Sequence, residues 1–488
     1  PGGPVTTSVL TSVLIWLPIG AALVIWALPL SRYAIGSLAV LVSLVEVGIW
    51  IEQAVRFDFA KTGLQFSERW PWIGDLHVSY HVGEYAFSLW LVGLTVVVMA
   101  ACIGYGFWVG RDRPRAYFGL MLMLTGSTVG MFLAQDLLLF YAFFEGMLVP
   151  LYVLVGVWGG AKRLGATVKL LIYTMTGSLI MLSAIIVYGL KGHTFDLVGG
   201  PLNSSRWLFL AFMFAFAIKA PLFPFHGWLP DAYREAPPEV AAVLSGVVAK
   251  AGTYGMLRIA LTKFPEPANY YRTLILALGA AALVYGSILA FRAVDMRGVI
   301  GYSSMAQSGL ITLGLFSGTN LGYDGAVLQM IAHGLVSASL FLLAGTVERR
   351  TTTGEFFRLG GMAKGRPALA TLLMTAAIIS LAVPGSATFA GEFLILAGVY
   401  HQGWWWAVIG AGAIVLAAMY MLRLISGVLH DARGPTVREE AMDLRTGELA
   451  LIVPLIAALL LLSAWPAGIS RHSFAGDHPL NDVFVQFR

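Results

Sequence analysis

Five ionisable residues stand inside apolar runs of this sequence, where they could carry protons through a membrane. They are Glu145, Lys219, Lys250, His333 and Glu392. A charged side chain at the centre of a bilayer costs roughly 2.5–3.5 kcal/mol on insertion scales, so each of them needs a partner or a task. Burial and nearby charges move proton affinities across neutral pH, where histidine titrates unaided. The five residues predict a relay in the membrane plane, in which Glu145 tunes Lys219 and Glu392 is the last group.

The same charges could instead be structural pairs that hold helices together, which explains any one of them alone. Five such residues on five different runs, two of them beside a helix break, favour proton transfer. Their polar neighbours fit either explanation. Ser303, Ser304 and Gln307 could orient waters of the relay or simply pack helices. His226 could load the relay from one side or hydrogen-bond carbonyls that a break frees.

The stretch after Lys219 predicts a broken membrane helix. Pro221 and Pro224 follow closely, and proline removes a backbone donor and clashes with the preceding turn. Lys219 lies about 20 Å along its apolar run at 1.5 Å per residue, well inside a hydrocarbon core of about 30 Å. A broken membrane helix requires protein or water to satisfy the freed carbonyls, so we expect a charged, hydrated break here.

A second break is expected at Pro384 and Gly385, shortly before Glu392. Glu392 follows Lys219 by 173 residues, or five predicted spans. Because five is an odd number of membrane crossings, the second repeat would be inverted in the membrane relative to the first. Inverted repeats with discontinuous helices at matching positions are typical of transporters. The chain is therefore expected to form a single membrane domain, 1–488, in four parts: N-terminal helices in 1–110, a first repeat in 115–261, a second in 270–428 and a C-terminal helix in 447–469.

Composition indicates an all-α polytopic membrane protein. The 488 residues are 58% hydrophobic and 12% charged, with a mean hydropathy of +0.79, whereas soluble proteins carry about 25% charged residues. Long uninterrupted apolar runs exclude a barrel of alternating strands. The formal charge of +5 fits basic cytoplasmic loops, so we expect lipids and not nucleic acid as partners.

Fourteen spans are expected, and the longest early loop, 53–84, places Trp70 and Trp72 at the membrane interface. The spans are 8–29, 33–52, 85–109, 115–134, 136–158, 167–190, 206–228, 238–261, 270–291, 297–317, 325–347, a broken one near 367–400, 404–428 and 447–469. Loops after odd-numbered spans hold nineteen of the 31 Lys and Arg residues, and the other side holds ten. The positive-inside rule then predicts both termini outside a bacterial cytoplasmic membrane.

The sequence lacks the residues that other kinds of membrane protein chemistry require. Cys102, the single cysteine, cannot ligate an iron–sulfur cluster alone and is expected to pack between helices. A haem bound by His226 and His333 would leave the buried Glu and Lys residues unexplained. The sequence has no Walker loop and no HExxH motif, so neither ATP-driven transport nor metalloproteolysis is indicated, and no metal site is expected.

Two motifs resemble a known family. They are Phe144-Glu145-Gly-Met-Leu-Val-Pro150 and Lys219-Ala-Pro-Leu-Phe-Pro-Phe-His226-Gly-Trp-Leu-Pro230. They resemble the antiporter-like membrane subunits of respiratory complex I, and within them the bacterial NuoM type. The resemblance covers nearly the whole chain. It implies fourteen helices with two inverted five-helix repeats, and it assigns the proton-transfer roles to Glu145, Lys219, Lys250, His333 and Glu392.

The resemblance also implies function and partners. The chain would be a proton-pumping module of NADH:quinone oxidoreductase that performs no redox chemistry itself. FMN, iron–sulfur clusters and quinone would be bound by other subunits, and no cofactor is expected in this chain. Its partners would be the peripheral subunits and the other membrane subunits, notably two sister antiporter-like subunits.

Two positions refine this resemblance. Glu392 matches the NuoM type, because the sister subunits typically carry lysine there. Gln307 departs from the family, which often has histidine in a Ser-Ser-x-x-His pattern where this chain has Ser303-Ser304-Met-Ala-Gln307. Glutamine cannot bind and release a proton near neutral pH, so this link would depend on water or on Lys250 and His333. Two related assignments stay open: a subunit of an Mrp-type cation/proton antiporter, and the membrane arm of an energy-converting hydrogenase.

Overall fold

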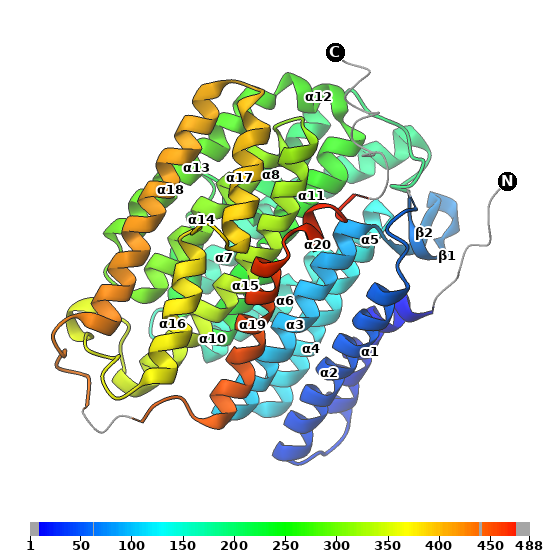
Figure 1. Ribbon diagram of the computed structural model, residues 1–488. Coiled ribbons are helices and arrows are strands. Elements are labelled where there is room, and N and C mark those ends of the chain that lie inside the picture. The colour runs from blue at the N-terminus through cyan, green and yellow to red at the C-terminus, as the bar shows by residue number, and fades with distance from the viewer. Residues whose placement is uncertain (1–8, 62, 439–441, 475–488) are drawn as a thin grey trace.

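The apolar runs of the sequence form long helices that stand side by side, as Figure 1 shows for the computed structural model. The structure describes residues 9–61, 63–438 and 442–474. Within them, eleven segments are long and apolar enough to cross a membrane. These are Leu10–Ala27 (α1), Arg32–Arg56 (α2), Ala86–Val109 (α3), Pro114–Leu133 (α4), Leu137–Trp158 (α5 and α6), Arg163–Gly192 (α7), Pro238–Leu261 (α10 to η3), Arg272–Arg292 (α13), Asn320–Thr351 (α15), Trp404–His430 (α18 and η5) and Thr446–Ala464 (α19).

Several of these segments change geometry along their length. Their parts are Leu137–Gly146 (α5), Leu148–Trp158 (α6), Pro238–Val243 (α10), Leu244–Val248 (η2), Lys250–Gly255 (α11), Met256–Leu261 (η3), Trp404–Ile425 (α18) and Ser426–His430 (η5). The three η segments named here are π-helical, with one extra residue per turn. Short helices lie between the long ones: Leu229–Glu235 (α9), Pro265–Tyr270 (α12) and Ala467–Ser470 (α20).

Three of the expected spans are not among the eleven. They correspond to Arg206–Lys219 (α8), to Met296–Leu315 (α14), and to the pair Pro367–Ser380 (α16) and Ala387–Tyr400 (α17). α8, α16 and α17 are short because the chain breaks there, and α14 is long but carries a polar face. The helical membrane fold is confirmed, whereas the count of fourteen and the inverted repeats stay predictions.

The segment 53–84 is not the plain loop that the sequence analysis expects. It contains a two-stranded antiparallel sheet, Gln65–Ile73 (β1) with Val78–Glu84 (β2), joined by the short 3-10 helix Gly74–Leu76 (η1). The two strands pair along their length, with Trp70 opposite Tyr80. Trp70 and Trp72 are both mostly exposed on this hairpin. The two strands are short and lie between the long apolar helices α2 and α3, so their pattern is weak in the sequence.

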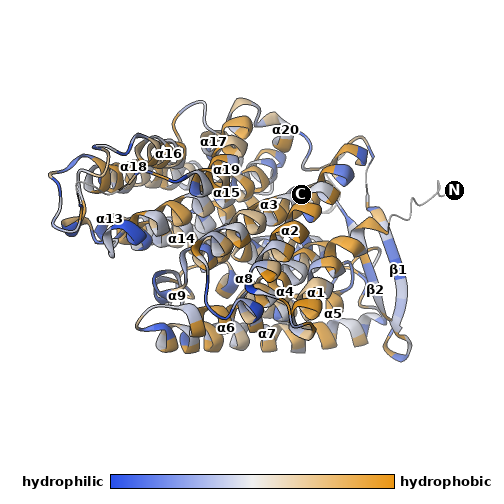
Figure 2. Cartoon of the chain, turned by 90° about the horizontal axis from the view of Figure 1, so that it is seen from below, coloured by the Kyte–Doolittle hydropathy of each residue, from blue (hydrophilic) through white to orange (hydrophobic). Residues whose placement is uncertain are grey.

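Both described ends of the chain lie at the hairpin end of the bundle. Thr11 Oγ1 donates a hydrogen bond to the Phe66 carbonyl at 3.0 Å, and the His472 ring lies 5.1 Å from the Phe59 ring. The predicted outside location of the termini themselves falls on residues 1–8 and 475–488, outside the described residues. Figure 2 shows that hydrophobic residues predominate along the helices and hydrophilic residues in the connecting segments. Cys102 is fully buried in α3, in the apolar core.

Candidate functional site

Lys219 is the last residue of α8, and its ammonium group is buried beside the break. The residue is 4% exposed, and Nζ lies 4.8 Å from the centroid of the Phe144 ring on α5. Glu145, half-buried at the next position, is the carboxylate whose charge acts on Lys219. Among the described residues, Lys219 forms no ion pair within 4.0 Å and no side-chain hydrogen bond. The two charges are therefore neighbours that do not touch in this structure.

Protein donors satisfy the carbonyls at the break that follows α8. Trp228 Nε1 donates to the Ile218 carbonyl at 3.0 Å. The backbone N–H groups of Ala220 and Leu222 donate to Phe216 and Ala217 at 2.8 and 2.9 Å. Pro221 and Pro224 lie in the turns between α8 and α9. Lys219 thus sits at a helix C-terminus, where the backbone dipole favours a positive charge.

His226 lies in the same turns, but its ring donates to no carbonyl of the described residues. Its ring stacks on Phe223 at 5.9 Å and meets Tyr285 of α13 edge-on at 5.4 Å. Its Nδ1 is buried and has no hydrogen-bond partner among the described residues. Of the two roles considered from the sequence, carbonyl binding has no contact to support it here, and proton loading stays a prediction.

Lys250 begins α11 between the two π-helical segments η2 and η3. It is 1% exposed, and Nζ donates to the Ser245 carbonyl at 2.8 Å, five residues back. π-helical turns are frequent at functional sites because they free or redirect backbone groups. Gly252 lets α11 lie directly on the break, since a Cβ there would meet the Ala220 nitrogen at 2.6 Å. Lys250 and Lys219 therefore occupy adjoining elements.

A cluster of serine hydroxyls connects the Lys250 turn to His333. Ser245 Oγ lies 2.9 Å from Ser304 Oγ on α14 and 2.5 Å from Ser337 Oγ on α15. Ser304 Oγ lies 3.1 Å from His333 Nε2. His333 is buried at mid-length of α15, a helix that the protein surrounds on all sides. Hydroxyl groups both donate and accept, so the cluster is suited to relay a proton.

Glu392 is held by a second polar cluster, which lies about one helical turn from the first along α14 and α15. Gln307 Nε2 donates to Glu392 Oε1 at 2.9 Å, and Gln329 Nε2 donates to Gln307 Oε1 at 2.7 Å. Glu392 is 1% exposed, and its Oε2 has no hydrogen-bond partner among the described residues. The carboxyl group lies in the second turn of α17, after the break that contains Pro384 and Gly385. Gly385 has φ +96°, which favours glycine.

Helix geometry places the two clusters next to each other. Ser304 and Gln307 are three residues apart on α14, and Gln329 and His333 are four apart on α15. Residues at these spacings share one face of a helix. No hydrogen bond joins the two clusters among the residues that the structure describes, so a proton would need a water or a side-chain movement between them. Ser303 instead donates to the Ile300 carbonyl of its own helix at 2.9 Å.

Sequence analysis missed three members of this polar core: Ser245, Gln329 and Ser337. Each is fully buried and uncharged. A buried serine or glutamine is common in membrane helices, so its presence in an apolar run carries little signal. The signal that could have found them is helical spacing to a residue already selected, since Gln329 and Ser337 each lie four residues from His333.

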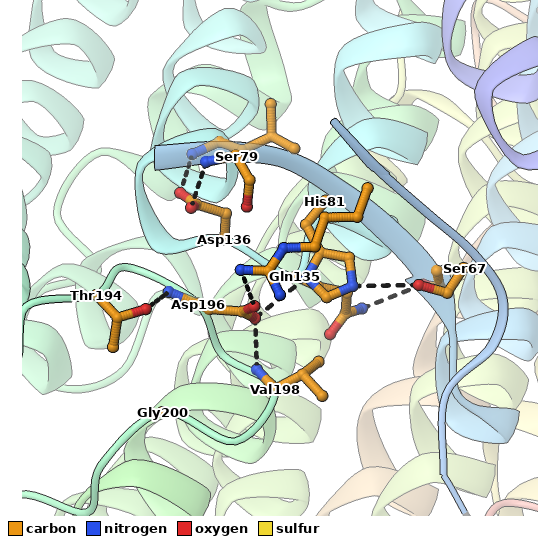
Figure 3. Close-up of polar contacts among 12 residues, drawn as sticks. Ser67, Ser79, His81, Gln135, Asp136, Thr194, Asp196, Val198 and Gly200 are labelled. Carbon is orange, nitrogen blue, oxygen red and sulfur yellow. Dashed lines mark hydrogen bonds and ion pairs between the residues drawn. The ribbon is translucent and has the colours of Figure 1, made fainter. Parts of the chain in front are cut away.

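A third polar cluster ties the hairpin to the helices (Figure 3). Asp196, in the segment after α7, lies 3.1 Å from His81 Nδ1 and 3.0 Å from an Arg69 nitrogen. Burial raises the pKa of the Asp196 carboxyl, but hydrogen bonds from His81 and Val198, with the charges of His81 and Arg69, lower it below its ordinary value. Asp136 caps the N-terminus of α5 through Leu138 and accepts from the Ser79 backbone at 3.1 Å. The hairpin is thereby fastened to the helix that carries Glu145.

Replacing Asp196 by asparagine is expected to loosen the hairpin. The variant leaves the buried His81 and the exposed Arg69 without their carboxylate, a loss of about 1–3 kcal/mol. Hydrogen–deuterium exchange of residues 65–84 should then accelerate roughly tenfold or more at neutral pH. A lowered pKa stabilises the folded state above the unfolded pKa of about 3.9, so protection of the unsubstituted hairpin should persist from pH 8 to pH 5.

The matched control is Asp58→Asn. Asp58 is an exposed aspartate in the loop before β1; its carboxylate pairs with Lys61 at 3.7 Å and accepts a hydrogen bond from the Ala60 backbone at 3.0 Å. Its loss should leave hairpin exchange unchanged. Equal exchange rates in the two variants would show that the Asp196 cluster does not hold the hairpin.

Glu84, the last residue of β2, was also missed. It is fully buried, and neither carboxyl oxygen has a hydrogen-bond partner among the described residues. Burial raises the pKa of Glu84 to about 8. The group is thus predominantly protonated at neutral pH. In the described part of the chain, no three His, Cys, Asp or Glu side chains are placed to hold a metal ion.

Comparison with known proteins places these features in a family. The family described as "NADH:quinone oxidoreductase/Mrp antiporter, TM" matches residues 134–417, which contain every residue of the two clusters. The NADH-quinone oxidoreductase subunit M of Rickettsia prowazekii (strain Madrid E) is 37% identical over 422 residues, covering 85% of this chain and 86% of that protein.

Solved structures agree with this placement. A chain of respiratory complex I from Thermus thermophilus with bound NADH is 30% identical, with a TM-score of 0.88 over 98% of this chain and 99% of that one. A chain of the Mrp complex from Dietzia sp. DQ12-45-1b shares the fold alone, at 21% identity and a TM-score of 0.81, and this chain covers 53% of it. The protein therefore belongs to the NADH:quinone oxidoreductase/Mrp antiporter membrane family, and within it to the subunit M type of NADH:quinone oxidoreductase.

Proposed function

We propose that this chain carries protons across the membrane through the buried polar groups of α8, α11, α14, α15 and α17. It is an antiporter-like subunit of respiratory complex I, and NADH:quinone electron transfer in other subunits drives it. One observation carries the proposal: in the buried interior, one hydrogen-bonded cluster runs from Lys250 through Ser245 and Ser304 to His333, and a neighbouring cluster holds Gln307 and Glu392.

Each residue has a separate role that follows from its chemistry. Glu145 acts on the charge of Lys219, so approach or withdrawal of the carboxylate changes how tightly Lys219 holds a proton. Lys250 and His333 can each hold a proton, and the serine hydroxyls between them can pass it on. Glu392 is the last group, with one oxygen held by Gln307 and the other free to accept a proton.

The two breaks support the proposed internal repeat. Lys219 ends α8 at the first break, and Glu392 follows the second break by two helical turns at most. We place the first repeat in 115–261 and the second in 270–428, flanked by the helices of 1–110 and 447–469. Discontinuous helices at matching positions of two inverted halves would then form the transport site between them.

The rest of the complex supplies what this chain does not contain. FMN, the iron–sulfur clusters and quinone are assigned to partner subunits, and the two sister antiporter-like subunits are the expected membrane neighbours. The bias of nineteen against ten basic residues supports an orientation with both termini outside a bacterial cytoplasmic membrane. The hairpin would then lie on the outer side, with the basic loops inside.

Lys250→Ala and Gln307→Ala test the path through the two clusters. Lys250 can hold a proton, and loss of a proton-carrying group commonly costs about 10²–10⁴ in rate, so pumping should fall at least tenfold. Gln307 only hydrogen-bonds, and water can replace it, so its loss should be the milder one. Both are measured as proton uptake per NADH oxidised in inverted membrane vesicles.

Thr253→Ala is the matched control. Thr253 is buried on the same short helix as Lys250, and among the described residues its hydroxyl donates only to the Lys250 backbone carbonyl and the Met330 sulfur. Its loss should leave pumping near the unsubstituted level. Equal losses in Lys250→Ala and Gln307→Ala, at equal assembly, would assign Gln307 a role beyond hydrogen bonding.

A further inference from the structure

A basic pocket lies at the end of the bundle opposite the hairpin. It opens where α3 and α15 end, at Val109 and Thr351, and where α19 begins, at Thr446. Its volume is about 190 Å³. Its walls come from these three helices and the chain leading into α19: Trp108, Arg349, Arg350, Met442, Arg445 and Glu448. None of these residues belongs to the polar clusters of the proposed proton path.

The charges in the pocket do not balance. Arg350 is fully engaged: it pairs with Glu448 at 2.6 and 3.0 Å and donates to the carbonyls of Thr346, Met442 and Asp443. Arg349 and Arg445 have no ion pair among the described residues, and Arg445 reaches only the Met442 sulfur at 4.0 Å. With Arg350 neutralised by Glu448, two guanidinium groups remain to receive an anion.

The surroundings of the pocket indicate a bilayer surface. Trp108, at the end of α3, is 40% exposed, and tryptophan is enriched at the level of lipid headgroups. Farther along α19, Val453, Leu460 and Leu461 present an exposed apolar face. An apolar helix face below a pair of unpaired arginines is complementary to a molecule with acyl chains and a negatively charged head.

We propose that this pocket binds the phosphate of an anionic membrane phospholipid. Arg349 and Arg445 receive the phosphate oxygens, for which the guanidinium group offers paired donors. Arg350 and Glu448 hold the wall of the pocket in place. Basic pockets between membrane helices on the cytoplasmic side are suited to such headgroups, and the basic loops assign this end of the bundle to that side.

A photoactivatable phosphatidylglycerol tests the proposal in the purified complex, embedded in phosphatidylcholine nanodiscs. Cross-linking to this chain should fall roughly tenfold in the double variant Arg349→Gln/Arg445→Gln, because two charge-assisted contacts are lost. The double variant Arg349→Lys/Arg445→Lys keeps both charges and should retain most of the label. Retention in the lysine variant shows that charge, and not a folding defect of the glutamine variant, accounts for the loss.

The matched control is Arg358→Gln/Arg438→Gln. Both arginines are exposed at the same end of the molecule and neither lines the pocket, so labelling should not change. Equal labelling of the pocket variant and this control would overturn the proposal. The proposal would also be overturned if excess inorganic phosphate removed the label from the unsubstituted complex. That result would assign the pocket to a soluble anion. A neutral photoactivatable phosphatidylcholine that labels the chain equally well would likewise overturn the proposal.

Discussion

Replacing Lys219 by alanine is expected to nearly abolish proton pumping while the complex still assembles. Lys219 is buried at the end of α8, and the charge of Glu145 acts on it from the neighbouring helix. Removing Glu145 leaves Lys219 as an uncompensated buried charge, which costs several kcal/mol or forces neutralisation, and removing Lys219 leaves the half-buried Glu145 without its neighbouring positive charge. Glu145→Ala should therefore have the same effect. Loss of the tunable lysine also removes the first proton acceptor of the proposed relay.

Both variants are measured as quinone-dependent NADH oxidation and as proton uptake in membranes with equal amounts of assembled complex. Lys191→Ala is the control, because Lys191 is an exposed lysine in the last turn of α7, where it makes no ion pair among the described residues. It should pump like the unsubstituted chain. Normal turnover and pumping in both Lys219→Ala and Glu145→Ala would refute the assignment of this pair to the proton path.

Glu392 separates a proton-carrying role from a structural one. In Glu392→Gln the amide oxygen can still accept from Gln307, so the shape and the 2.9 Å contact are kept but titration is lost. In Glu392→Asp titration is kept and the reach is one methylene shorter. A group that only pins α17 should tolerate glutamine at least as well as aspartate, because burying a neutral amide costs less than burying a charge.

We expect the opposite order: aspartate should retain part of the activity and glutamine should lose most of it. Coupling between the modules of the complex could mask a partial block in turnover alone. Proton uptake per NADH is therefore measured together with turnover in reconstituted vesicles. If glutamine equals or exceeds aspartate in both measurements, Glu392 does not lie on the proton path.

Much of the architecture follows from the sequence, because a bilayer imposes strong one-dimensional rules. Spans need long apolar runs, so the boundaries of α3, α4 and α13 lie within two residues of those expected. Proline ends a helix by removing a donor, so the stretch around Pro221 and Pro224 could be expected to interrupt the seventh span. Buried charges are costly and rare, so Lys219, Lys250 and Glu392 can be identified as candidate site residues from the sequence alone.

The tertiary structure alone decided which of these residues meet. Contacts between α11, α14, α15 and α17 depend on how each helix is rotated about its axis and how closely it packs against the others. Gly252 and the π-helical turns around Lys250 set the rotation and the packing distance of α11. Neutral residues such as Ser245 and Gln329 gain a role only through their neighbours. The hairpin and the basic pocket likewise join segments far apart in the chain: Asp196 with His81, and Arg349 with Arg445. Such pairings depend on packing in three dimensions, which local patterns of hydropathy do not encode.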